Sequence, residues 1–506
     1  MLLEVDMLAA FSNLFKIGEL RARLLFTLLI LVVVRVGSFV TCPGVDASVL
    51  QRWFDSQLGS AGSGGVAALF NIFSGGSLEN CAVFSLGVMP YISASIMLQL
   101  LTAVVPSLGK LVKEEGGRSR VQQYTRYAAI GLCIFQGYLL ALSFENPSQS
   151  PFLRGIEAQI AQSGVPLVSH GGLWFRFVVV FTLVAGTLAL MWLGDQITER
   201  GVGNGMSLII SVGILSRLPA GLIQAWKSFV PSASTAGTVR PLILVVLVCF
   251  FVAVIASVIC LTQGQRRVSV QYAKRVVGRK VYGGQTQYMP LKINYAGVMP
   301  IIFAQALLIF PSTVASLLFK DSRAAQSFAA AMTGGLPHYV AYAALLFFFS
   351  YFWVATQFQP QQIAEDLKRY GGYLPGVRPG AETARFLDTV MSRLTFAGAT
   401  FLLLVAICPQ LLSRQMRVPE ITAQFFGGTS LLIVVGVVLD TMRQLETHLI
   451  ERQYDGFLRA PTTRGRSVRT PEGKRDQARQ RHMVFLFVTV AAFLLVAVIV
   501  VYSLGR

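Results

Sequence analysis

The chain has 506 residues, of which 54% are apolar and 13% charged, and its formal net charge is +19. Soluble domains carry roughly 25% charged residues, so this composition excludes an ordinary soluble protein and predicts several membrane spans. In a soluble protein the positive charge would suggest nucleic-acid binding. In a membrane protein it is typical of basic cytoplasmic loops.

Eleven apolar runs are long enough to cross about 30 Å of hydrocarbon. They fall near 24–41, 80–105, 124–144, 173–193, 205–225, 241–262, 295–318, 338–358, 394–412, 426–442 and 483–503. With a cytoplasmic N-terminus, most of the 43 Lys and Arg lie in cytoplasmic loops. We therefore expect a multi-pass protein of the cytoplasmic (inner) membrane in that orientation.

A glycine-rich stretch, GDQITERGVGNGMS (194–207), separates the fourth run from the fifth. Its three alternate glycines also suggest a phosphate-binding loop, but no strand precedes it and no Gly-Lys-Ser/Thr follows. We interpret it as a cytoplasmic turn in which Asp195, Glu199 and Arg200 meet water.

The outer loop after the first run contains a flexible linker, GSAGSGG (59–65), followed by VAALFNIFSGG. This apolar segment of about eleven residues is too short to span the bilayer. Two interpretations stay open: a re-entrant segment, or an amphipathic helix on the outer surface.

Two cytoplasmic loops, 263–292 and 359–393, are longer and polar. Alternation of Val268, Val270 and Tyr272 with polar residues predicts a hairpin-like protrusion in the first. IAEDLKRY followed by Gly-Gly predicts a short helix with a glycine stop in the second. Such loops are either solvated connections or docking surfaces for partners.

The second and seventh runs begin with the same four residues, Gly-Val-Met-Pro, at 87–90 and 297–300. Five spans separate the two copies, and an odd number places them in opposite orientations. If the match is more than chance, it indicates an inverted repeat.

Ionisable residues are scarce inside the runs, and among them are Arg35, Arg176 and Asp440. Arg35 and Asp440 either snorkel to water or pair with neighbouring helices. Ion-coupled carriers usually need more buried charge, which disfavours a small-solute transporter. We find no catalytic constellation or metal motif either, so we expect neither an intramembrane enzyme nor a metal or other cofactor.

Residues 16–456 resemble the bacterial SecY family of protein-conducting channels. The motifs that carry the resemblance are FSGGS (73–77), GVMPYISASIMLQLL, QYTRY (123–127), WLGDQITERGVGNGMS, YAKRVVGRKVY, LPGVRPG (374–380) and FGGTSLLIVV (426–435). The resemblance implies an all-α polytopic fold of two inverted five-helix halves around a central pore. It implies translocation of unfolded secretory proteins and sideways release of membrane segments into lipid.

Carried over position by position, the resemblance implies three sets of channel residues. The pore ring falls on Val88, Ile92, Ile210, Ile302, Val314 and Ile433. The plug, about 66–77, includes Leu69, Phe70, Asn71, Ile72, Phe73, Ser74, Gly75 and Gly76. Ser93 and Phe310 face one another across the lateral gate.

The implied partners are SecE-like and SecG-like small membrane subunits, the ATPase SecA, the ribosome, signal peptides, nascent chains and the lipid bilayer. Arg279 and Lys280 in one cytoplasmic loop and Arg378 in the other would contact rRNA phosphate or acidic partner groups. The resemblance makes the chain a channel subunit, with energy supplied by the motor or ribosome.

We expect an N-terminal half at 1–230, a C-terminal half at 231–447, a basic linker at 448–482 and an extra helix at 483–503. The last run has no charge, and seven Lys and Arg lie just before it between 464 and 481. These features predict a span beyond the family's ten, with the C-terminus outside. Whether this extension is dispensable stays open.

Overall fold

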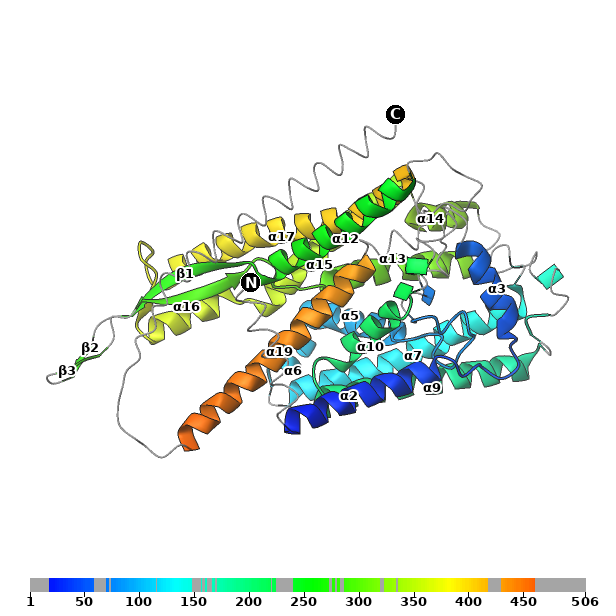
Figure 1. Ribbon diagram of the computed structural model, residues 1–506. Helices are drawn as coiled ribbons and strands as arrows, with labels where there is room; N and C mark the ends of the chain where they lie inside the picture. Colours follow the sequence, from blue (N-terminus) through cyan, green and yellow to red (C-terminus); the bar gives the residue numbers. More distant parts are fainter. Residues whose placement is uncertain are drawn as a thin grey trace.

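The computed structural model describes most of the chain as long helices with one small sheet at one end (Figure 1). The described residues are 18–58, 70–71, 74–114, 116–147, 156, 160–161, 166–168, 171–219, 221–223, 240–272, 275–277, 280–282, 286–318, 323–333, 335–416 and 429–459. The eleventh apolar run, 483–503, and the basic linker after residue 459 lie outside these ranges.

The described part of the first half of the chain contains seven helices. They are α2 (Gly18–Gly37), α3 (Ala47–Leu58), α5 (Met89–Val104), α6 (Pro106–Lys113), α7 (Gly117–Glu145), α9 (Leu173–Arg200) and α10 (Gly205–Leu215). Helix α5 contacts α7, α7 contacts α9, and α9 contacts both α2 and α10. Helices α5 and α6 meet at a bend of 106° just before Pro106, because proline disfavours helical geometry in the residue before it.

The second half forms α12 (Arg240–Gln263), α13 (Met299–Leu318), α14 (Arg323–Thr333), α15 (Leu336–Gln357), α16 (Pro360–Arg369), α17 (Ala381–Met416) and α19 (Thr429–Arg459). Helix α13 contacts α15, α15 contacts α17, and α12 contacts α19. The two halves meet where α5 contacts α13 and α10 contacts α19. Ten of the apolar runs thus contribute to helices in the expected order.

Strands β1 (Gln265–Tyr272) and β4 (Thr286–Lys292) pair antiparallel, with Gln265 opposite Lys292. Between them β2 (Arg275–Val277) and β3 (Lys280–Tyr282) form a second antiparallel pair. This confirms the predicted protrusion. Helix α16 followed by Gly371 at φ +72° confirms the predicted short helix with its glycine stop.

The loops at 263–292 and 359–393 form one structural unit, which was not expected from the sequence. Strand β5 (Gly372–Tyr373), from the second loop, pairs with β1 from the first and gives the order β4-β1-β5. Val268 and Leu291 pack with Phe358, Leu374 and Leu387 in a buried cluster of their own.

The expected turn lies within the glycine-rich stretch but is shorter than the stretch, most of which is helical. Helix α9 continues to Arg200, and only residues 201–204 lie between it and α10. A Cβ on Gly205 would lie 1.9 Å from the Gly194 carbonyl oxygen, so glycine is required for the helices to approach. Glu199 and Arg200 are exposed, as expected, and Asp195 is partly exposed and pairs with Arg126 at 2.6 Å.

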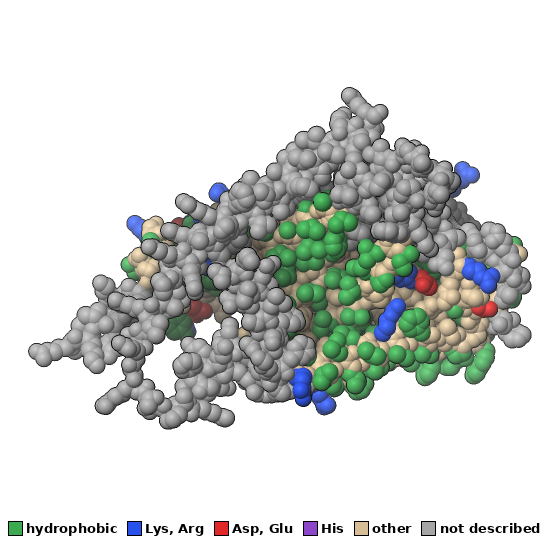
Figure 2. All heavy atoms as spheres, viewed as in Figure 1, with side chains coloured by type: hydrophobic (Ala, Val, Ile, Leu, Met, Phe, Trp, Pro, Cys, Tyr) green, Lys and Arg blue, Asp and Glu red, His purple; other side chains and the backbone are tan. Residues whose placement is uncertain are grey.

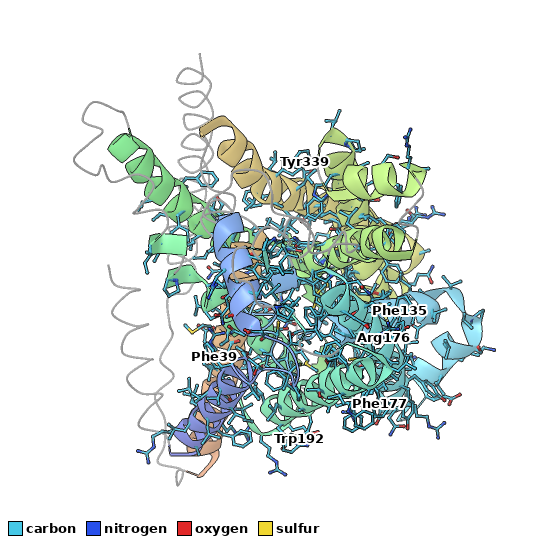
Figure 3. The ribbon with its side chains drawn as sticks, turned by 90° about the vertical axis from the view of Figure 1, so that its right-hand side faces the viewer. Phe39, Phe135, Arg176, Phe177, Trp192 and Tyr339 are labelled. Carbon is cyan, nitrogen blue, oxygen red and sulfur yellow. The ribbon has the colours of Figure 1, made fainter. Side chains whose placement is uncertain are left out.

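Exposed apolar side chains follow the outer faces of α2 and α9. Figure 2 shows hydrophobic side chains over α2, with Lys or Arg at the end of that helix. Figure 3 labels Phe177 and Trp192, which lie toward the outside of the bundle on α9. Trp174 and Trp192, both exposed, are about 27 Å apart along the helix axis. This spacing suits two aromatic belts at the membrane interfaces.

By length and composition, four helices in the described ranges can cross a membrane, or five if α5 and α6 form one broken span. This is fewer than the eleven runs. Helix α10, for example, has 11 residues and a length of about 16 Å, roughly half the hydrocarbon thickness.

Candidate functional site

Five of the six expected ring residues lie in one buried hydrophobic cluster. They are Val88 at the start of α5, Ile92 in α5, Ile210 in α10, Ile302 in α13 and Ile433 in α19, and each is at most 8% exposed. The sixth position, Val314, is within α13, but its side chain is outside the described part. Helices from both halves therefore contribute aliphatic side chains to a shared interior.

A small cavity of about 30 Å³ adjoins this cluster. Its lining includes Val88, Arg35, Ser74, Gly75 and Gly213. A cavity needs roughly 10–15 Å³ to hold a water molecule, so this one has room for water beside polar groups. The aliphatic cluster and the polar segment at 74–77 thus meet at this cavity.

The segment that matches the plug is buried where the structure describes it. Phe70 and Asn71 are helical, and the chain then makes successive turns from residue 74 to residue 88. Asn71 and Ser74 are 3% and 9% exposed. The re-entrant interpretation is therefore supported, and the alternative of an outer-surface helix is wrong for these residues. Leu69, Ile72 and Phe73 lie outside the described residues.

Local hydrogen bonds shape this segment. The Ser74 N–H donates to the Phe70 carbonyl at 2.9 Å, and the Gly76 N–H donates to the Asn71 carbonyl at 2.9 Å. The Ser77 hydroxyl donates to the Ser74 carbonyl at 2.8 Å. These bonds satisfy buried backbone groups without a regular helix, as a segment enclosed in protein requires.

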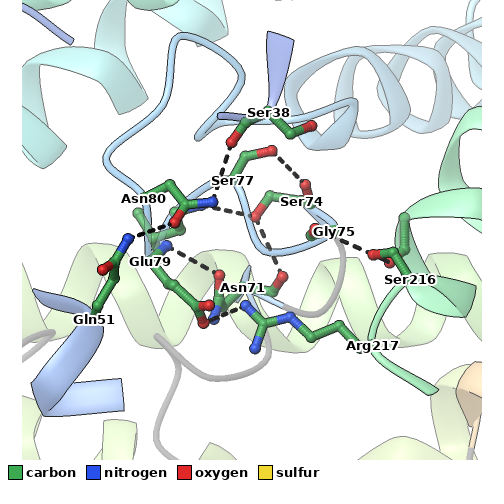
Figure 4. Close-up of polar contacts among 12 residues, drawn as sticks. Ser38, Gln51, Asn71, Ser74, Gly75, Ser77, Glu79, Asn80, Ser216 and Arg217 are labelled. Carbon is green, nitrogen blue, oxygen red and sulfur yellow. Dashed lines mark hydrogen bonds and ion pairs between the residues drawn. The ribbon is translucent and has the colours of Figure 1, made fainter. Parts of the chain in front are cut away.

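Two arginine side chains hold the same segment, and Figure 4 shows one of them, Arg217, beside Glu79. The Arg35 guanidinium of α2 donates to the Gly75 carbonyl at 2.7 Å. Arg217, just after α10, forms an ion pair with Glu79. Arg35 therefore pairs with a neighbouring segment, as one of the two sequence interpretations expected. Sequence reasoning missed Glu79, which lies just before the second apolar run. It also missed Arg217, although a charged residue inside the fifth run (205–225) is a signal that could have found it.

The two gate helices are in contact, since α5 packs against α13. Ser93 in α5 is partly buried. The side chain of Phe310 in α13 lies outside the described part, so its position opposite Ser93 stays a prediction.

The expected partner-binding residues flank the cytoplasmic sheet. Arg378 is exposed in the loop between β5 and α17, and its carbonyl accepts a 2.9 Å hydrogen bond from the Thr383 hydroxyl. Lys280 begins β3, and Arg279 lies outside the described residues. Because β5 pairs with β1, the Arg378 loop and the strand hairpin extend from the same sheet.

The family model described as SecY matches residues 82–442. The Protein translocase subunit SecY of Escherichia coli (strain K12) is 41% identical over 453 residues, covering 89% of this chain and 96% of that protein. A solved structure titled "The structure of a protein conducting channel" aligns with a TM-score of 0.58 at 16% identity, covering 87% and 94% of the two chains. Another solved structure, titled "Sec61 in the Canine ribosome-channel complex from the endoplasmic reticulum", aligns with a TM-score of 0.55 at 16% identity and covers the same shares of the two chains.

The fold is therefore that of two inverted halves around a central pore, and the protein is a multi-pass membrane protein. On the length and identity of these matches, the chain belongs to the SecY family.

Proposed function

We propose that this protein is a protein-conducting channel that moves unfolded secretory proteins across the cytoplasmic membrane. The observation that carries the proposal is the buried set of Val88, Ile92, Ile210, Ile302 and Ile433, drawn from helices of both halves. A pore for any sequence cannot rely on specific polar contacts, whereas aliphatic side chains deform around a chain and exclude water when it is absent.

The plug segment closes this pore from the outer side. Its described residues are buried next to Val88 and α10, which is where a closing element has to lie. Opening requires the segment to leave, because its backbone occupies the space beside the ring.

Membrane segments leave sideways between α5 and α13. These helices belong to opposite halves and are in contact, so separating them opens a path from the ring to lipid. Ser93 and Phe310 are the positions that separate, and a signal peptide is the ligand that enters between them.

The cytoplasmic sheet and the Arg378 loop dock the partners that supply energy. The exposed Arg378, with Arg279 and Lys280 near the hairpin tip, suits rRNA phosphate and acidic protein groups. We propose the ribosome and the ATPase SecA as the partners and assign the chain no catalytic reaction. SecE-like and SecG-like subunits complete the assembly in the membrane.

The proposed orientation places the N-terminus and the sheet in the cytoplasm and the plug outside. The proposed domains are 1–230 and 231–447, followed by the linker and the span 483–503. A cysteine placed after Leu504 tests the last span in intact cells with a membrane-impermeant maleimide. Labelling of intact cells supports an external C-terminus, whereas labelling only after the inner membrane is opened contradicts it.

A stalled secretory chain tests the function itself. With a photoreactive probe at Ile92, we expect the chain to cross-link to the pore, and a matched probe at the lipid-exposed Phe181 to give no cross-link to the translocating stretch. Equal cross-linking at the two positions, or none at Ile92, contradicts the proposal.

A further inference from the structure

The segment from Ser74 to Asn80, here called the return segment, connects the plug to α5. It includes the charged residue Glu79, which is partly buried with its side chain 25% exposed. A partly buried carboxylate is costly unless it is paired. Its partners therefore indicate what the segment is built to hold.

Glu79 connects three parts of the molecule. Its carboxylate pairs with the Arg217 guanidinium, whose side chain is 14% exposed. The same carboxylate accepts a 3.1 Å hydrogen bond from the Asn71 side-chain amide. The Glu79 N–H donates in return to the Asn71 side-chain oxygen, also at 3.1 Å. Asn71 thus orients Glu79 toward Arg217.

A second arginine, Arg35, also contacts the return segment. Arg35 donates to the Gly75 carbonyl at 2.7 Å, and the Ser216 hydroxyl lies 3.4 Å from the same oxygen. Arg35 contacts Gly75, and the Arg217 guanidinium lies beside the next residue, Gly76. Without Glu79, two guanidinium groups would lie near one another with no carboxylate between them.

The fit between the return segment and α10 is close. A Cβ on Gly75, where φ is +68°, would lie 2.6 Å from the Gly213 Cα. A Cβ on Gly76 would lie 2.8 Å from the Arg217 guanidinium. Backbone therefore meets backbone at this point, and the ion pair forms only when the segment is seated.

The end of the return segment is tied separately. The Asn80 amide donates to the Ser38 carbonyl at 3.2 Å, and Gln51 of α3 donates to the Asn80 side-chain oxygen at 2.8 Å. This tie does not use Arg35, Glu79 or Arg217. Breaking the ion pair would therefore release the plug side of the segment while Asn80 keeps its own contacts.

We propose that the Glu79–Arg217 ion pair, supported by the Arg35–Gly75 hydrogen bond, is a latch that positions the plug and sets how readily the channel opens. The proposal rests on the channel function proposed above. The two residues are 138 positions apart in the sequence, so their ion pair forms only when the plug is seated against α10. Removing one partner leaves a partly buried charge unpaired, which destabilises the closed state.

Ion conductance of the full-length protein in planar bilayers with potassium chloride tests the latch. Glu79→Gln and Arg217→Gln each raise the idle conductance at least about tenfold. The charge-swapped variant, Glu79→Arg with Arg217→Glu, returns it to within about threefold of the parent. The matched control is Glu382→Gln, which breaks an exposed pair with Arg385 and leaves the conductance unchanged. The latch is overturned if the single variants are as silent as the parent. It is also overturned if the single variants leak and the charge-swapped variant leaks as much as they do.

Cysteine labelling separates unlatching from misfolding. A cysteine placed at Ser74, a position on the plug side that is 9% exposed, and Cys133 in α7 are both buried in the seated state. In detergent, Glu79→Gln speeds maleimide labelling of the cysteine at position 74 at least about fivefold and leaves Cys133 protected. Equal exposure of both thiols identifies a folding defect and overturns the specific assignment.

The same bilayers distinguish this proposal from the channel function. The parent must conduct when a secretory chain is stalled in it. If the parent conducts with the stalled chain and Glu79→Gln is as silent as the idle parent, the latch is excluded and the channel function stands. A parent that never opens overturns both.

Discussion

The two Gly-Val-Met-Pro copies begin helices of the same kind in different surroundings. Gly87 and Gly297 have φ values of +57° and +62°, and each precedes a helix, α5 or α13, with proline in its first turn. Before Gly87 lies the return segment, held by two arginines. Before Gly297 lies the cytoplasmic sheet, and the Asn294 amide donates to the Gly297 carbonyl at 2.9 Å.

One inverted motif is thus used in two different surroundings. The helix start is local and is the same in both copies, whereas the two proposed tasks, closing the pore and presenting a docking surface, depend on the segment before it. Figure 1 shows the sheet and α3, the outer helix beside the return segment, at opposite ends of the molecule. The following variants break or sharpen the comparison, in order of their expected effect on stability.

Glycine at both Ile92 and Ile210 should have the largest effect. Each change removes a buried branched side chain, which costs about 2–5 kcal/mol, and adds roughly 1 kcal/mol of helix penalty. Water can then remain in the ring, so we expect idle ion current and a lower temperature of thermal inactivation. Glycine at the exposed α9 residues Leu188 and Phe181 is the matched control for the current. A silent double variant means that the ring is assigned wrongly.

Leu291→Ala should destabilise the docking end and leave the pore closed. Leu291 is 1% exposed in the cluster beneath the sheet, so the change costs about 2–5 kcal/mol. We expect faster proteolysis of the cytoplasmic loops and weaker ribosome binding, with idle conductance equal to that of the parent. A leaking Leu291→Ala channel would show that the two ends are coupled.

Gly87→Ala and Gly297→Ala compare the two copies directly. A side chain in the left-handed region costs about 1–2 kcal/mol, so both variants should lose similar thermal stability. Only Gly87→Ala should raise idle conductance, since it adjoins the return segment and the ring. Equal conductance of the two variants would remove the functional distinction between the copies.

Arg378→Glu should change stability least and docking most. The side chain is exposed, so we expect a stability change within about 0.5 kcal/mol. A reversed charge repels an acidic or phosphate partner, so SecA-driven export of a reporter into vesicles should stop. Arg385→Glu, on the neighbouring exposed face, is the charge control. Normal export by Arg378→Glu would exclude this residue from the docking surface.

The sequence by itself determined the membrane class, ten helices in order, the hairpin, the short helix α16 and the inverted motif. These features depend on local signals: apolar length, alternation along a strand, glycine stops and proline at helix starts. It also named the aliphatic ring by resemblance, and five of those six residues lie together in the interior.

Tertiary structure alone decided which distant groups meet. Glu79 and Arg217 are 138 positions apart, and only the packing of the return segment against α10 brings them together. By sequence Arg35 could equally have reached water, but the structure places its guanidinium 2.7 Å from the Gly75 carbonyl. The pairing of β5 with β1 likewise joins two loops that are far apart in the sequence and that the sequence pattern does not connect. Sequence patterns report the periodicity of one segment, whereas ion pairs and sheet edges depend on how segments pack, and no local pattern records that.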